Sequence, residues 1–153
     1  MSLKKRKKAL KAIYFMQIID GIVGSLVGIF IPVFLYTLDF SLTQIFLFLI
    51  AYQAAVAGGA FVAVWLARLT GFQQTFVLRF PLAISYYLIL YNFTGTVIPL
   101  WLLAALGGLQ AALYWVPLNI LFTKMSPEKE LGSSIATMMA VPMIGGIVAP
   151  FIG

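Results

Sequence analysis

The hydrophobic and polar positions along the chain divide it into long apolar segments separated by short polar connectors. An α-helix rises 1.5 Å per residue, so about 17–25 apolar residues cross the ~30 Å hydrocarbon layer of a bilayer. We therefore predict an all-α integral membrane protein with about five transmembrane helices. The predicted spans are approximately 12–36, 42–66, 75–91, 97–122 and 133–153.

The connectors carry the signals of helix ends. Ser41 and Gln44 have the spacing of a capping box, which predicts that the second helix begins directly after Ser41. Residues 67–74 form a short polar turn that contains Gly71, and residues 92–95 form another. Residues 123–132 are the only connector with both acidic and basic side chains. These short links leave no room for a separate soluble domain.

The composition excludes several classes of protein. Hydrophobic residues make up 63% of the chain and charged residues 9%, and the mean hydropathy is +1.06. A soluble domain of this composition would aggregate in water. The chain has no His and no Cys, so zinc sites and Ser-His or Cys-His nucleophiles cannot be built. We expect neither an enzyme nor a metal or cofactor site.

Six of the ten basic residues lie in the first eleven positions. Beside an apolar span, such a cluster is a topogenic signal that also attracts anionic lipid. No aromatic residues alternate with the basic ones, so we expect no nucleic-acid partner. A cleaved signal peptide has an apolar region of about 7–15 residues. The apolar run here is much longer, which predicts an uncleaved span preceded by a basic segment, residues 1–11.

The remaining basic residues predict the orientation. If the N-terminus is cytoplasmic, Arg68, Arg79, Lys124 and Lys129 fall on the cytoplasmic side with the N-terminal cluster. Asp39 is then the only charge on the outer side. This one-sided distribution predicts a multi-pass protein of the plasma membrane with its N-terminus in the cytoplasm.

Asp20 is the only acidic residue within a predicted span. A carboxyl group costs a few kcal/mol in hydrocarbon, so it should face protein or water. Because burial favours the neutral form of a carboxyl, Asp20 is the candidate for binding a proton or a cation. The alternative is a structural role, in which Asp20 accepts a hydrogen bond from another helix or pairs with a basic group near the inner interface.

Other polar and aromatic side chains in the spans could line a solute cavity. Gln110 and Tyr114 are four residues apart and should share one helix face, with Trp115 and Asn119 on the adjacent one. We expect Arg79 to extend back to the interface, which leaves the cavity without a basic group and suited to amphipathic or weakly cationic solutes. Bonding between helices is the alternative role for each residue. The candidates are Tyr14, Gln17, Tyr52, Gln53, Gln110, Tyr114, Trp115 and Asn119.

Small residues and prolines predict helix packing and bending. Gly145, Ala149 and Gly153 repeat every four residues, a spacing that lets another helix approach closely. Pro142 and Pro150 free backbone carbonyls in the last span, which would permit a gating helix to bend, although packing alone also explains the pattern. The residues assigned to conformational or packing roles are Gly71, Pro142, Gly145, Gly146, Ala149 and Pro150.

Five places in the chain resemble the N-terminal half of a major facilitator superfamily transporter. They are the GIFIPVF and FSLTQI stretches at 28–34 and 40–45, the turn at 66–71, the Gly- and Ala-rich helix at 99–117, the connector at 126–132 and the GGIVAPFIG element at 145–153. Arg68 stands where the family signature has an acid, so the usual charge relay of that turn is not expected. The last element is similar to one in the fifth helix of many antiporters.

The resemblance implies secondary active transport of a small solute by two halves that alternate access. The fifth-helix element favours the proton-coupled, outward-directed form of such transport. The chain would then be truncated before a sixth span. Its partners would be the bilayer, the solute, and a missing C-terminal half or a second copy. The alternative is a small non-transporting membrane protein that packs with partner helices, or a non-functional transporter fragment.

Overall fold

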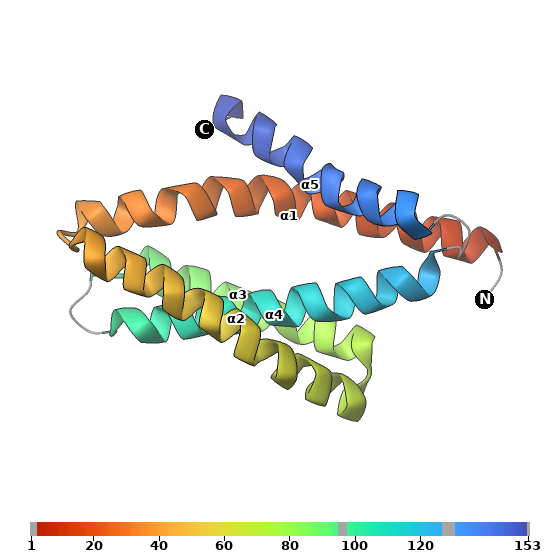
Figure 1. Cartoon of the computed structure of the whole chain (residues 1–153), viewed down its shortest axis with the longest axis horizontal. Helices are drawn as coiled ribbons and strands as arrows, with labels where there is room; N and C mark the ends of the chain where they lie inside the picture. The colour runs from red at the N-terminus through yellow and green to blue at the C-terminus, as the bar shows by residue number, and fades with distance from the viewer. Residues whose placement is uncertain (1–2, 95–97, 127–130, 153) are drawn as a thin grey trace. The chain divides into compact units, whose positions relative to one another are not determined.

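The computed structural model describes residues 3–94, 98–126 and 131–152, and the side chains of 10–25, 28, 30–94, 98–126, 132–144 and 147. Within these ranges the secondary structure is entirely helical, which confirms the predicted all-α class (Figure 1). One helix lies in each of the five predicted segments. The helices are α1 (Leu3–Thr37), α2 (Leu42–Thr70), α3 (Phe72–Tyr91), α4 (Leu100–Met125) and α5 (Leu131–Ile152).

The first helix begins nine residues earlier than the predicted span. Residues 3–20 contain neither Gly nor Pro, and Leu, Lys, Arg and Ala are good helix formers, so nothing interrupts the helix between the basic cluster and the apolar run. At 35 residues, α1 is about 52 Å long and exceeds the thickness of a bilayer core. The basic cluster therefore continues the helix that enters the apolar segment.

The start of α2 confirms the predicted capping box. The backbone N–H of Gln44 donates to Ser41 Oγ at 3.3 Å, and the backbone N–H of Ser41 donates to Gln44 Oε1 at 2.9 Å. These bonds satisfy donors that the first turn of a helix otherwise leaves open. The helix begins where the sequence predicts it because this signal is local.

Only Gly71 separates α2 from α3. Its φ is +91°, a conformation that side chains disfavour, so glycine permits the reversal of the chain here. Thr75 Oγ1 donates to the Gly71 carbonyl at 3.0 Å, and Thr70 Oγ1 donates to the Leu66 carbonyl at 3.0 Å. The predicted turn at 67–74 thus shrinks to one residue, because both helices extend into it.

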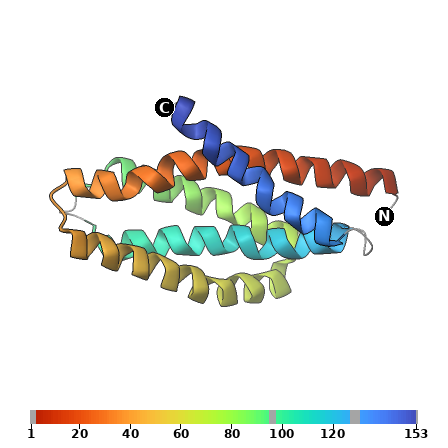
Figure 2. The ribbon, with the colours of Figure 1, turned by 45° about the horizontal axis from the view of Figure 1, so that its top comes forward.

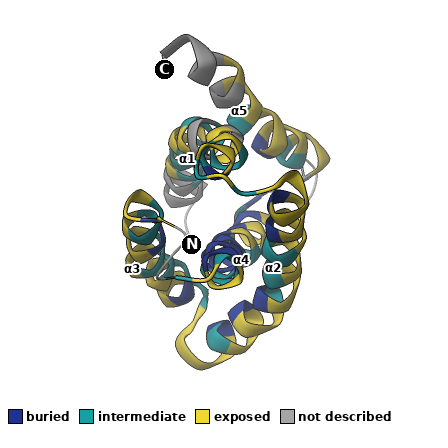
Figure 3. Ribbon diagram, turned by 90° about the vertical axis from the view of Figure 1, so that its left-hand side faces the viewer, coloured by how far each residue is buried: buried dark blue, intermediate teal, exposed yellow. Residues whose placement is uncertain are grey.

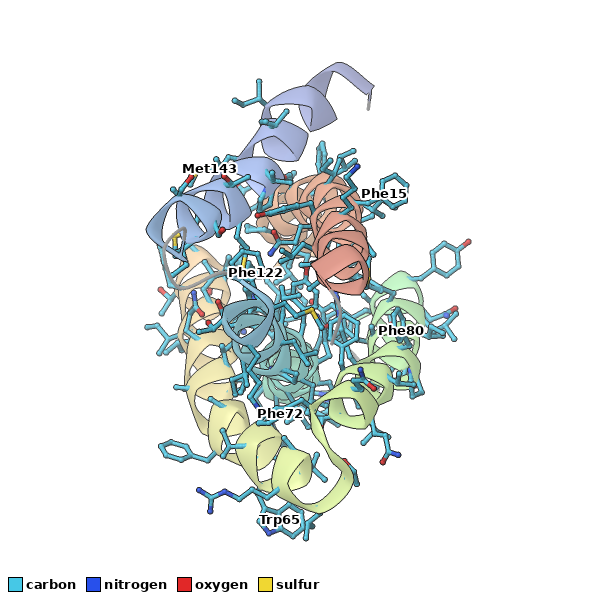
Figure 4. The ribbon with its side chains drawn as sticks, turned by 90° about the vertical axis from the view of Figure 1, so that its right-hand side faces the viewer. Phe15, Trp65, Phe72, Phe80, Phe122 and Met143 are labelled. Carbon is cyan, nitrogen blue, oxygen red and sulfur yellow. The ribbon has the colours of Figure 1, made fainter. Side chains whose placement is uncertain are left out.

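Three of the described helices are long and apolar enough to cross a membrane by length and composition: Leu10–Thr37 within α1, then α2 and α4. Large apolar side chains are exposed on them, as on Phe15 and Trp65, which project away from their helices in Figure 4. Hydrocarbon rather than water is the suitable environment for so many exposed apolar side chains. Membrane crossing by α3 and α5 stays a prediction.

The chain forms two compact units, residues 35–121 and residues 1–34 with 122–153. In the first unit α4 lies between α2 and α3, and its side chains are the most deeply buried (Figure 3). A β-carbon placed on Gly108 would be 2.5 Å from both the Tyr52 carbonyl oxygen and Ala55 Cβ. A β-carbon on Gly59 would be 2.8 Å from Ala112 Cβ. Small residues therefore bring α2 and α4 into backbone contact.

On the faces where α2 and α4 pack together, small residues recur every four positions. The sequence predicts the same spacing for the last span. Ala55, Gly59 and Ala63 are four residues apart on α2, and so are Gly108 and Ala112 on α4. Lacking a hydrophobic driving force between them, helices in lipid gain stability from such close approach. The predicted face of Gly145, Ala149 and Gly153 lies outside the described side chains.

In the second unit, α1 and α5 run in the same direction, as Figures 1 and 2 show. The two helices meet at Gly21, where a β-carbon would lie 2.6 Å from the Pro142 carbonyl oxygen and 2.7 Å from Pro142 Cα. The Tyr14 ring meets the Phe122 ring edge to face, with centroids 5.9 Å apart. Gly21 thus allows α5 to touch the backbone of α1 beside Asp20.

Candidate functional site

Arg79 forms a polar cluster between α3 and α4. Its guanidinium carbon lies 3.9 Å from the centroid of the Tyr114 ring, and its Nε donates to Gln110 Oε1 at 3.5 Å. Gln110 and Tyr114 are buried, with 6% and 2% of their surface exposed. Phe76 covers another side of Tyr114 at 5.8 Å between ring centroids. The cation is therefore held by an aromatic face and an amide oxygen inside the helical unit.

The Arg79 side chain turns to Gln110 and Tyr114 of α4, whereas we expected from the sequence that it would extend back along its own helix to the interface. Gln110 lies ten residues, about 15 Å, from the first residue of α4, so the Arg79 side chain reaches the middle of a membrane-length helix. Two of the candidate cavity residues therefore contact a basic group, which we did not expect from the sequence. Cation–π attraction to Tyr114 and the bond to Gln110 replace part of the hydration that would otherwise favour the interface.

The shared face of Gln110 and Tyr114 is confirmed, since both residues contact Arg79. Trp115 and Asn119 are exposed, and Asn119 Nδ2 donates to the Trp115 carbonyl of its own helix at 2.7 Å. The Trp115 ring touches Tyr114 at 5.2 Å between centroids. Of the four α4 candidates, Gln110 and Tyr114 therefore belong to the Arg79 cluster.

Tyr52 of α2 also points to α4, whereas Gln53 is exposed. A β-carbon on Gly107 would lie 3.0 Å from Tyr52 Cε2 and 2.8 Å from Tyr86 Cε2, so this glycine makes room for two rings. Tyr86 of α3 is 2% exposed, and its hydroxyl has no hydrogen-bond partner in the described part of the chain. Sequence reasoning missed Tyr86, because nothing local marks it as the tyrosine that faces Gly107.

The second unit contains the candidates of the first helix. Asp20 is half-buried and immediately precedes Gly21, where α5 crosses. Gln17 lies one turn earlier and is 1% exposed, and neither Nε2 nor Oε1 has a hydrogen-bond partner among the residues that the structure describes. Tyr14 contacts Phe122. The first helix thus carries a buried amide whose nitrogen and oxygen have no partner in the described part of the chain.

On α5, Pro142 packs against Gly21. The candidates Gly145, Gly146, Ala149 and Pro150 lie within the helix but outside the described side chains. The predicted packing role of the last span is therefore visible only at Pro142.

In the described residues, the fold is all-helical, three helices are long and apolar enough to cross a membrane, and a cation is held inside one helical unit. Comparisons with models of known families, with curated proteins and with solved structures give no significant match.

We expect the contact between Arg79 and Tyr114 to contribute to stability. A double-mutant cycle of Arg79→Met and Tyr114→Leu should give a coupling free energy of about 1–2 kcal/mol, the range of a largely desolvated cation–π pair. The measurement is the free energy of unfolding in mixed detergent micelles. Arg68→Met, which removes an exposed arginine from α2, is the matched control, and its coupling to Tyr114→Leu should be near zero. Equal coupling in both cycles would contradict the assignment.

Proposed function

We propose that this chain is part of a secondary active transporter that moves a small solute across the plasma membrane. The observation that carries the proposal is the guanidinium of Arg79 held against the middle of α4 by Gln110 and Tyr114. A charge inside a membrane-spanning bundle is costly and by default marks a functional site. The resemblance of the chain to the N-terminal half of a major facilitator transporter supports the same class of function.

In this proposal all five helices cross the bilayer, and the N-terminus is cytoplasmic. The support is the distribution of the ten basic residues, which the five-span arrangement puts on one side. A C-terminal half or a second copy would complete the solute path, because transporters of this kind enclose it between two repeats.

Asp20 is the proposed coupling site, where a proton binds and is released. Its position beside the contact of Gly21 with Pro142 supports this role, because movement of α5 against α1 would alter the surroundings of the carboxyl. Arg79 adds a positive charge to the residues proposed to line the cavity. The solute class therefore includes molecules with an anionic or strongly dipolar group besides amphipathic ones.

The experiment is a flux assay with the purified protein in proteoliposomes. We expect an imposed pH gradient to drive accumulation of a solute from a panel of amphipathic cations, zwitterions and carboxylates, about tenfold above protein-free vesicles. Dissipating the gradient with a protonophore should abolish the accumulation. If no member of the panel accumulates, the transport proposal fails for these solute classes.

A packing protein without transport activity is the second candidate. The observation that favours it is the space beside Gly24 and Gly28 of α1, where a β-carbon would meet no atom of the described residues within 4 Å. Such positions, four residues apart, allow the backbone of an added helix to approach. A stable oligomer in detergent, weakened by Gly24→Leu, together with absent flux would support this function over transport.

A further inference from the structure

The side-chain amide of Gln17 is buried near the crossing of α1 and α5 and has no hydrogen-bond partner among the described residues. Its side chain is 1% exposed, and its amide nitrogen and oxygen both lack partners in the described portion of the chain. A buried amide without hydrogen bonds is unfavourable, and native structures usually satisfy such groups with an ordered water or an ion. Something polar that binds at Gln17 is therefore expected.

The same place contains a backbone acceptor on α5. Gln17 precedes Gly21 by four residues, and Met138 precedes Pro142 by four. The two helices run in the same direction (Figure 2). Because Gly21 meets Pro142, Gln17 and Met138 each lie one turn, about 6 Å along the helix, before the crossing. Met138 is only 3% exposed. Both residues are therefore buried at the same level of the α1–α5 pair.

Pro142 makes the Met138 carbonyl available. Proline has no amide hydrogen, so within α5 the carbonyl four residues earlier loses its normal helical donor. The crossing thus contains a carbonyl oxygen that lacks its usual helical donor, the Gln17 amide without partners among the described residues, and the carboxyl of Asp20 one helical turn from Gln17. Freed carbonyls and amide side chains are the groups that hold water or ions inside transporters.

We infer that Gln17, the Met138 carbonyl and Asp20 form a binding site for internal water that carries protons to Asp20. Water is favoured over a metal cation because it can accept from Gln17 Nε2 and donate to Gln17 Oε1, whereas a cation would use only the oxygen. A hydronium ion gives one proton to the Asp20 carboxylate and remains as water, and the reverse step releases the proton. The water's role as proton carrier rests on the proposed function, but its presence does not.

Met138 offers a reporter for this water. X-ray radiolysis converts bound water to hydroxyl radicals, which oxidise methionine next to the water even where bulk solvent does not reach. We expect Met138 in the purified protein to be oxidised despite its burial, and its oxidation rate, measured by peptide mass spectrometry, to fall about fivefold in Gln17→Leu, where the water loses its amide partner. Met139 and Met143, which are 60% and 68% exposed, serve as internal references whose rates should not change.

The matched control is Gln53→Leu, which removes an exposed glutamine from α2 and should leave the Met138 rate unchanged. An unoxidised Met138 in the unmodified protein, or an equal rate in folded Gln17→Leu, overturns the inference. If Gln17→Leu does not fold, Gln17→Ile replaces it, and the Met138 rate of the unmodified protein tests the site without any variant. Gln17-dependent oxidation in a protein that shows no flux would preserve the water site and reject the transport proposal.

Discussion

Replacing Gly108 with valine should separate α2 from α4 and destabilise the protein more than any other single substitution in this unit. A β-carbon at Gly108 would lie 2.5 Å from the Tyr52 carbonyl oxygen and 2.8 Å from the Val56 nitrogen. These are backbone atoms of α2, which cannot rotate away as the end of a side chain can. We expect a loss of about 3 kcal/mol or more in the free energy of unfolding, at the upper end of overpacking effects. The fluorescence of Trp65 and Trp101 during unfolding in detergent measures it.

Gly58→Val is the matched control for this prediction. Gly58 lies in the middle of α2, and a β-carbon there would meet no atom within 4 Å among the residues that the structure describes. Both substitutions exchange the same residue types inside a helix, so their intrinsic helix-propensity effects are similar. A comparable loss of stability in both variants would mean that helix propensity, and not the contact between α2 and α4, determines the result.

The helices of this fold were predictable because their signals are local. Apolar runs of membrane length marked all five, and the Ser41–Gln44 capping box marked the start of α2 correctly. The predicted start of α1 was wrong because the basic and the apolar residues differ in the surroundings they prefer, water or lipid. They do not differ in their preference for a helical backbone. Lys and Arg propagate a helix as well as Leu does.

The contacts between helices were less predictable. A helix that is apolar on all sides has no hydrophobic face that identifies its neighbour, and α4 is of this kind. The spacing of Gln110 and Tyr114 identified a shared face, yet only the folded chain shows that Arg79 occupies it. The glycines of α2 and α4 were visible in the sequence, but their pairing with Tyr52, Tyr86 and Ala112 depends on how the helices meet.

Asp20→Asn should abolish gradient-driven accumulation if Asp20 couples solute movement to protons. Asparagine has nearly the same shape and hydrogen-bonding reach as aspartate but cannot take up or release a proton at physiological pH. We expect accumulation in proteoliposomes under an imposed pH gradient to fall by about tenfold or more, to the level of protein-free vesicles, because the driving force no longer reaches the solute. Exchange of labelled for unlabelled solute, which needs no net proton movement, should persist.

Asp39→Asn provides the control, because Asp39 is an exposed acid in the turn before α2 and its φ of +63° is a conformation that asparagine also tolerates. This variant should fold and accumulate solute as the unmodified protein does. If Asp20→Asn retains gradient-driven accumulation at normal expression, Asp20 has no coupling role, and its carboxyl serves only the packing of α1. Loss of exchange together with accumulation in a folded Asp20→Asn variant would instead assign Asp20 to solute binding, because both processes need the bound solute but only accumulation needs the proton.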